Sequence, residues 1–131
     1  MGYPMALNIR RKIPSTSKLY IFDVSKAALE RFKEEASSHG EIIIASSSKE
    51  VTDNADTVIS MLPEGAHVKS AYLTPETGCI ATTSKSKKLF LDCSTIDAKT
   101  SIEVGTEIEK SGVGEFSDTP VSVESSYNLT N

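Results

Sequence analysis

The spacing of its apolar residues restricts the folds that are open to this 131-residue chain. Short apolar runs alternate with longer amphipathic stretches, and the two have the lengths of buried strands and of the helices that connect them. Because a helix between two strands returns the chain to the same end of a sheet, this order predicts an α/β fold with parallel strands. Strands are expected at residues 18–22, 42–45, 57–62, 88–92 and 115–118.

The amphipathic stretches contain residues that begin and end helices. Pro4 suits a first helical turn, and Ser25 and Asp97 can cap the helices that follow them. Gly40 and Gly112 are suited to end helices. Helices are therefore expected at residues 3–12, 26–39, 49–54, 64–72 and 98–112.

Some side chains receive structural assignments from the same patterns. The polar stretch at residues 74–86 is expected to be a mobile loop. Cys79 and Cys93 lack a metal-binding spacing, so we expect two reduced thiols and no metal site.

The lysines beside the 88–92 strand are expected to be solvated: Lys85, Lys87 and Lys88. In the last helix the spacing predicts a shared apolar face made by Ala98, Ile102, Gly105 and Ile108.

Length and charge limit the class of protein. The chain is long enough for one domain with a core, but not for two. Its 14 basic and 18 acidic residues give a formal charge of −4, which argues against nucleic acid as a partner. The apolar runs are far shorter than the roughly 20 residues of a membrane span, and no targeting segment is visible. Residues 123–131 have no core-facing period and are expected to form a disordered tail.

Gly2 and Asp23 have the spacing of a dinucleotide-binding fingerprint. In such a fingerprint the last glycine of G-x-G-x-x-G opens a helix that faces the pyrophosphate, and an acid about 20 residues later, after a strand, binds the adenosine ribose. Gly2 and Asp23 fit these two places, which puts the first strand and two glycines before Met1. Asp23 as a loop residue that caps the helix near Ser25 is the alternative.

Other expected strand ends carry polar or turn-forming residues. Residues 60–63, 91–95 and 118–122 each follow or end a strand. Any one of them alone is ordinary turn or capping chemistry. Together with Asp23 they indicate one edge of one sheet, where ligands of open parallel sheets bind.

These segments resemble the β-hydroxyacid dehydrogenases, and most closely the 3-hydroxyisobutyrate dehydrogenases. Residues 1–8 (MGYPMALN) are similar to the second half of the family's G-x-G-x-M-G-x-P-M-A-x-N loop, and Asp23 to its acid after the second strand. Residues 61–63 (MLP) and 92–95 (DCST) are similar to its M-L-P and D-x-S-T turns. Residues 118–122 (DTPVS) resemble the first half of its D-x-P-V-S-G-G loop, although Val123 and Glu124 replace the two glycines.

The resemblance implies a Rossmann-like, doubly wound parallel sheet that lacks its first strand. It implies a partial NAD(P)-binding domain at residues 1–122, with NAD preferred over NADP because the Asp23 carboxylate would repel a 2′-phosphate. Ser122 would contact the substrate. The positions that would bind the cofactor are Met1, Gly2, Asp23, Leu62, Pro63 and Thr95.

The resemblance also implies a function for the complete enzyme. It would oxidise a small 3-hydroxy acid to its semialdehyde in mitochondria, and the intact form could assemble as an oligomer. A lysine of a separate helical domain would be the catalytic group. We expect no catalytic residue and no activity in these 131 residues alone. His67 stands where the family usually has an asparagine and is interpreted as solvent-facing. A non-catalytic nucleotide-binding or protein-interaction module and an incomplete gene model are the alternatives.

Overall fold

The computed structural model describes residues 2–119 of the chain. Met1, Ser122 and the expected tail at residues 123–131 lie outside this range. In chain order the elements are α1 (Gly2–Lys12), β1 (Leu19–Ile21), α2 (Lys26–Ala36), the 3-10 helix η1 (Ser37–His39), β2 (Ile42–Ile44), α3 (Ser48–Asn54), β3 (Thr57–Ser60), α4 (Gly65–Leu73), the 3-10 helix η2 (Cys79–Ala81), β4 (Lys88–Asp92), α5 (Ala98–Ser111) and β5 (Gly114–Asp118).

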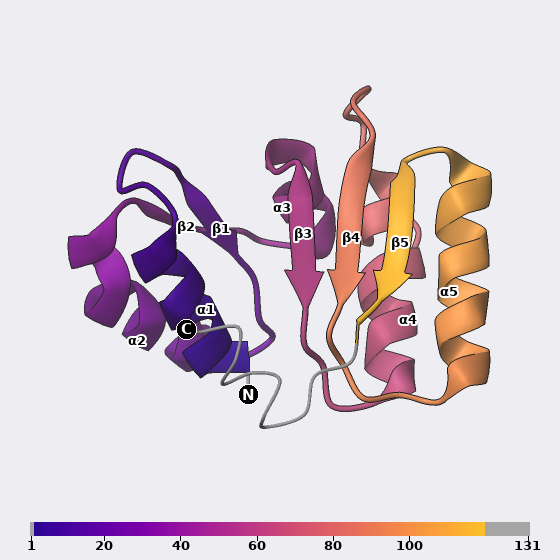
Figure 1. Ribbon diagram of the computed structural model, residues 1–131, viewed down its shortest axis with the longest axis horizontal. Helices are drawn as coiled ribbons and strands as arrows, with labels where there is room; N and C mark the ends of the chain where they lie inside the picture. The colour runs from indigo at the N-terminus through magenta and orange to yellow at the C-terminus, as the bar shows by residue number, and fades with distance from the viewer. Residues whose placement is uncertain (1, 120–131) are drawn as a thin grey trace.

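All paired strands are parallel and divide into two sheets. β1 pairs with β2, and the other sheet has the order β3-β4-β5. Figure 1 shows β1 on the side of its sheet that faces β3. Within residues 2–119, neither of these two facing edges has a strand partner. In the dinucleotide-binding strand order 3-2-1-4-5-6, this is the position of the first strand. The predicted parallel α/β fold is confirmed, and no strand of residues 2–119 lies at the place of the first strand.

Two separate clusters of buried residues hold the two sheets to their helices. The larger one is made by strands β3 and β4, helices α4 and α5, and η2: Val58, Val68, Tyr72, Cys79, Phe90, Val104 and Ile108. In it, the Tyr72 ring packs edge-to-face on Phe90 and Phe116, with centroids 5.7 and 5.3 Å away. The smaller one joins α1 and α2 to the first sheet: Phe32, Ala36 and Ile42, with Tyr3, Ala6, Leu7, Leu19 and Ile21 against them.

The apolar face predicted for the last helix is wrong at two of its four positions, because Ala98 and Ile102 are both exposed. Ile102 is 68% exposed, and the buried positions of α5 are Ser101, Val104, Gly105 and Ile108. Small residues on this face allow the helix to approach the sheet closely. A Cβ on Gly105 would lie only 3.1 Å from the Phe116 ring of β5. The correct face was hidden because it contains a serine and a glycine where a larger apolar residue is usual.

The prediction that Lys88 is solvated is also wrong. Its side chain is 3% exposed, with Nζ 3.9 Å from Asp56 Oδ1. Side chains alternate along a strand, so Lys88 shares the buried face of β4 with Phe90 and Asp92. Lys85 and Lys87, outside the strand, are exposed as predicted.

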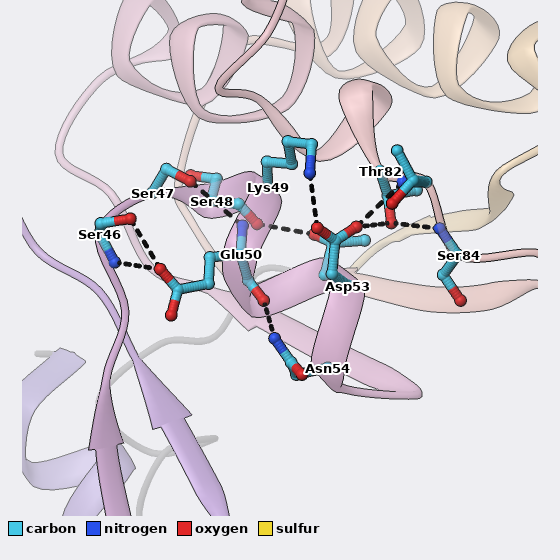
Figure 2. Close-up of polar contacts among 11 residues, drawn as sticks. Ser46, Ser47, Ser48, Lys49, Glu50, Asp53, Asn54, Thr82 and Ser84 are labelled. Carbon is cyan, nitrogen blue, oxygen red and sulfur yellow. Dashed lines mark hydrogen bonds and ion pairs between the residues drawn. The ribbon is translucent and has the colours of Figure 1, made fainter.

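The polar stretch at residues 74–86 is more ordered than a plain loop. It contains η2, whose Cys79 is 3% exposed and belongs to the larger core. Figure 2 shows how the segment is tied to α3, where Asp53 Oδ1 accepts bonds from Thr82 Oγ1 at 2.5 Å and from the amide of Thr83 at 3.0 Å. Burial raises the pKa of Cys79 to about 11. Both Cys79 and Cys93 are free thiols, as predicted.

Several helix caps agree with the sequence. Ser25 Oγ accepts the amide of Ala28 at 3.2 Å, and Asp97 accepts the amide of Thr100 at 3.0 Å. Gly112 follows α5 with a φ of 78°, a conformation that favours glycine. Among the helices of residues 2–119, none has the length and apolar character needed to cross a membrane.

Candidate functional site

A cavity of about 360 Å³ lies where the N-terminus of α1 meets the carboxyl ends of β3 and β4. Residues from three separate segments line it: Gly2, Met61, Leu62, Pro63 and Thr95. The structure therefore brings together four residues that the sequence singled out in three motifs. Open parallel sheets bind ligands at this end of their strands.

A second, larger hollow of about 630 Å³ lies along α5 and β5, beside Ile102, Gly105 and Phe116. None of the predicted cofactor residues that the structure describes lines it. We place the candidate site at the smaller cavity because motifs far apart in the sequence converge there and a helix N-terminus borders it.

Gly2 opens α1 and borders the cavity through the backbone. The first turn of α1 contains no acidic side chain, so the partial positive charge of its amides is available to an anion. A Cβ on Gly2 would meet its nearest neighbours in the chain, Met61 Cβ and O, at an ordinary 3.7 Å. No close packing among residues 2–119 demands glycine here. The missing side chain leaves room for a ligand to approach the helix end.

Asp23 lies just beyond β1, is exposed and does not line the cavity. Its Oδ1 accepts the backbone amide of Ser25 at 2.9 Å. Ser25, and not Asp23, provides the side-chain cap of α2. The carboxylate thus stands beyond the carboxyl end of β1, and its hydrogen bond to the Ser25 amide fixes the loop.

Leu62 and Pro63 form the turn between β3 and α4, and Thr95 belongs to the segment after β4. The backbone amide of Leu62 donates to Ser94 Oγ at 2.7 Å, which links these two segments. Ser94 Oγ in turn donates to Asp92 Oδ1 at 2.7 Å. Ser94 and Asp92 therefore support the wall of the cavity through their hydrogen bonds. This role was not predicted from the sequence, in which the two residues stood out only as parts of the D-x-S-T motif. The D-x-S spacing after a strand was the signal that could have revealed it.

His67 is an exposed residue of α4, as predicted. Met1 and Ser122, the remaining predicted site residues, lie outside the described range, so their roles stay predictions.

Residues 1–125 match the family described as the NAD binding domain of 6-phosphogluconate dehydrogenase. The chain belongs to this family. It is an NAD(P)-binding domain, and the match includes every motif at the cavity.

Named relatives and a solved structure refine this family membership. The chain is 39% identical over 122 residues to the Dictyostelium discoideum protein named "Probable 3-hydroxyisobutyrate dehydrogenase, mitochondrial", covering 93% of this chain and 35% of that one. It is 36% identical to the mouse mitochondrial 3-hydroxyisobutyrate dehydrogenase, covering 93% and 33%. The structure of the Mycobacterium tuberculosis 3-hydroxyisobutyrate dehydrogenase with L-serine is similar with a TM-score of 0.72 and 31% identity, covering 93% and 37%. The chain thus spans about a third of the length of these relatives.

Proposed function

We propose that the cavity holds part of an NAD molecule, in the dinucleotide domain of a 3-hydroxyisobutyrate-type dehydrogenase. The observation that carries this proposal is the convergence of Gly2, Leu62, Pro63 and Thr95 on one cavity from three separate segments. Its volume of about 360 Å³ is at the lower end of small-molecule sites, which span roughly 300–1,000 Å³. This size suits one portion of an extended dinucleotide.

Each residue has a distinct role in this proposal. The amides at the start of α1, at Gly2, face the pyrophosphate, and the absent side chain permits close approach. Leu62 and Pro63 provide apolar contact, and Thr95 a hydroxyl. The bound nicotinamide supplies the hydride acceptor, as in other enzymes of this cofactor. The residues of the chain bind and orient it.

Asp23 supports NAD rather than NADP. A carboxylate after the second strand of a dinucleotide fold accepts hydrogen bonds from the ribose 2′-hydroxyl, and its charge repels a 2′-phosphate. Asp23 is exposed at that position, and the Ser25 amide donates a hydrogen bond to only one of its two carboxylate oxygens, Oδ1. The other oxygen is free of this local bond and suits a ribose.

The names of the relatives extend the proposal to the whole protein. It oxidises a small 3-hydroxy acid to the semialdehyde, with Ser122 near the substrate, in the mitochondria of valine-degrading cells. We expect the family's catalytic lysine to lie in the part of the relatives that this chain does not cover, since the chain spans about a third of their length. A polypeptide of this sequence alone is therefore expected to bind the cofactor without turning over the substrate.

Calorimetric titration with NAD and NADP tests the cofactor assignment. Three proteins are compared: the unaltered chain, Asp23→Ala, and Glu34→Ala as a control that removes an exposed carboxylate of α2. The unaltered chain is expected to bind NAD more tightly than NADP. Because hydrogen bonds to a charged group are lost, Asp23→Ala should weaken NAD binding by about tenfold or more.

Asp23→Ala should also narrow the difference in affinity between NAD and NADP. Glu34→Ala should bind both cofactors with the affinities of the unaltered chain. Equal NAD affinity in Asp23→Ala and the unaltered chain would show that Asp23 does not contact the ribose. The absence of saturable NAD binding in a folded sample would overturn the proposed function itself.

A further inference from the structure

Asp92 is a buried carboxylate at the carboxyl end of β4, with a relative exposure of 0%. Its Oδ1 accepts three hydrogen bonds: from Ser60 Oγ at 2.9 Å, from Ser94 Oγ at 2.7 Å and from the Ser94 amide at 3.2 Å. Its Oδ2 has no hydrogen-bond partner among the described residues. One oxygen atom thus gathers donors from β3 and from the segment after β4.

The donors on this oxygen fix the direction of the hydrogen bonds around it. Ser94 Oγ gives its single hydrogen to Asp92, so its lone pairs face outward. One of them receives the backbone amide of Leu62 at 2.7 Å. The bond to Asp92 therefore fixes the orientation of the Ser94 hydroxyl, so that its oxygen accepts a hydrogen bond from the turn that follows β3. A freely rotating hydroxyl would not have this fixed orientation.

Backbone bonds place the same residues against their neighbours. The Cys93 amide donates to Ser60 O at 2.8 Å, and the Thr119 amide donates to Asp92 O at 2.9 Å. The ends of β3, β4 and β5 therefore meet around Asp92. Its burial in this junction makes each hydrogen bond stronger than it would be in water.

We propose that Asp92 is a positioning residue for the cofactor site: through Ser94, it holds the Leu62-Pro63 turn in the conformation that forms the wall of the cavity. Asp92 and Ser94 do not line that cavity, whereas Leu62, Pro63 and Thr95 do. The link from cavity wall to buried carboxylate consists of two 2.7 Å hydrogen bonds. The inference rests on the proposed function for its ligand, but the held turn is a property of the chain itself.

Two substitutions separate the parts of this arrangement. Ser94→Ala removes the acceptor of the Leu62 amide and leaves Asp92 in place. Asp92→Asn keeps an oxygen that can occupy the Oδ1 position and places the amide nitrogen where Oδ2 has no partner. Ser101→Ala is the matched control, since it deletes another buried serine hydroxyl, 5% exposed, on α5.

Native-state hydrogen exchange followed by NMR measures whether the turn is held. The Leu62 amide is compared with the Phe90 amide of β4, which reports on opening of the larger core. In Ser94→Ala, Leu62 should exchange about fivefold faster or more relative to Phe90, the factor expected for one lost hydrogen bond. Ser101→Ala should leave this ratio unchanged, and Asp92→Asn should largely retain it.

NAD titration of the same variants measures whether the held turn matters for binding. Ser94→Ala should weaken NAD binding on the order of fivefold, Asp92→Asn less, and Ser101→Ala should match the unaltered chain. An unchanged Leu62 ratio in Ser94→Ala overturns the proposal, and so does a changed ratio with undiminished NAD affinity. If the unaltered chain binds no NAD, the proposed function fails, and the positioning role in a cofactor site fails with it. The exchange ratio in Ser94→Ala still decides whether the hydroxyl of Ser94 holds the turn.

Discussion

A fully buried arginine organises the chain around the end of α1. Arg10 is 0% exposed, and its guanidinium donates to the carbonyl oxygens of Pro14, Ser17 and Glu41 at 2.5, 2.6 and 3.0 Å. These carbonyls belong to the loop before β1 and to the residue before β2. Arg10 thereby joins segments that are far apart in the sequence, by hydrogen bonds to backbone atoms.

Gly40 leaves the space that this guanidinium occupies. Its φ is +143°, and an added Cβ would lie 2.5 Å from Arg10 Cζ. Gly40→Ala should therefore lower the free energy of unfolding by about 3 kcal/mol, through backbone strain and the displaced arginine. Gly112→Ala is the control: its φ of +78° is also left-handed, but no atom of the described part of the chain lies within 4 Å of the added Cβ, so a loss of about 1 kcal/mol is expected. Equal losses in urea denaturation would contradict the role given to Arg10.

At the scale of elements, the short helix α3 depends on charged hydrogen bonds at both ends (Figure 2). Glu50 accepts the hydroxyl of Ser46 at 2.7 Å and its amide at 3.0 Å, and these bonds hold the pKa of Glu50 below its ordinary value. Burial opposes ionisation of Asp53, but the bonds from Lys49, Thr82 and Thr83 outweigh it, so the pKa of Asp53 is also lowered. Both carboxylates are therefore more stable as anions in the folded chain.

A lowered pKa in the folded state gives stability that is present above the unfolded pKa and is lost as the pH falls through the folded pKa. Glu50→Gln should therefore destabilise the chain at pH 7. The difference should shrink as the pH falls below about 4.5, the ordinary value for this carboxyl, because the carboxyl then becomes protonated in the folded state as well. Urea midpoints at pH 7 and pH 3 measure this, with Glu30→Gln on the exposed surface of α2 as the control. A deficit that is the same at both pH values would contradict the account.

The elements that sequence reasoning predicted well are those with local causes. Caps at Ser25 and Asp97, the stop at Gly112 and the apolar strands act over a few residues, so their signals are visible in one sequence. Burial of Lys88 and exposure of Ile102 depend on which face a neighbouring element covers, and periodicity alone does not give that. Likewise the residues of the cavity wall were predicted, but the support from Asp92 and Ser94 is a contact across strands.

At the scale of the whole molecule, the candidate site lies between two separately packed parts. Gly2 begins α1, which packs in the smaller cluster, whereas Met61, Leu62, Pro63 and Thr95 follow strands of the larger sheet. The two sheets share no strand pairing within residues 2–119. A ligand that contacts both sides of the cavity would therefore join them and stabilise the folded chain as a unit.

Thermal unfolding of the chain with and without NAD tests this account most directly. A ligand at about 100 times its dissociation constant adds about 2.7 kcal/mol to the folded state, which for a domain of this size raises Tm by about 10 °C. The account predicts one cooperative transition that NAD raises by this amount, and that it raises less in Asp23→Ala. A cooperative transition that does not move with saturating NAD would contradict the claim that this cavity is a dinucleotide site.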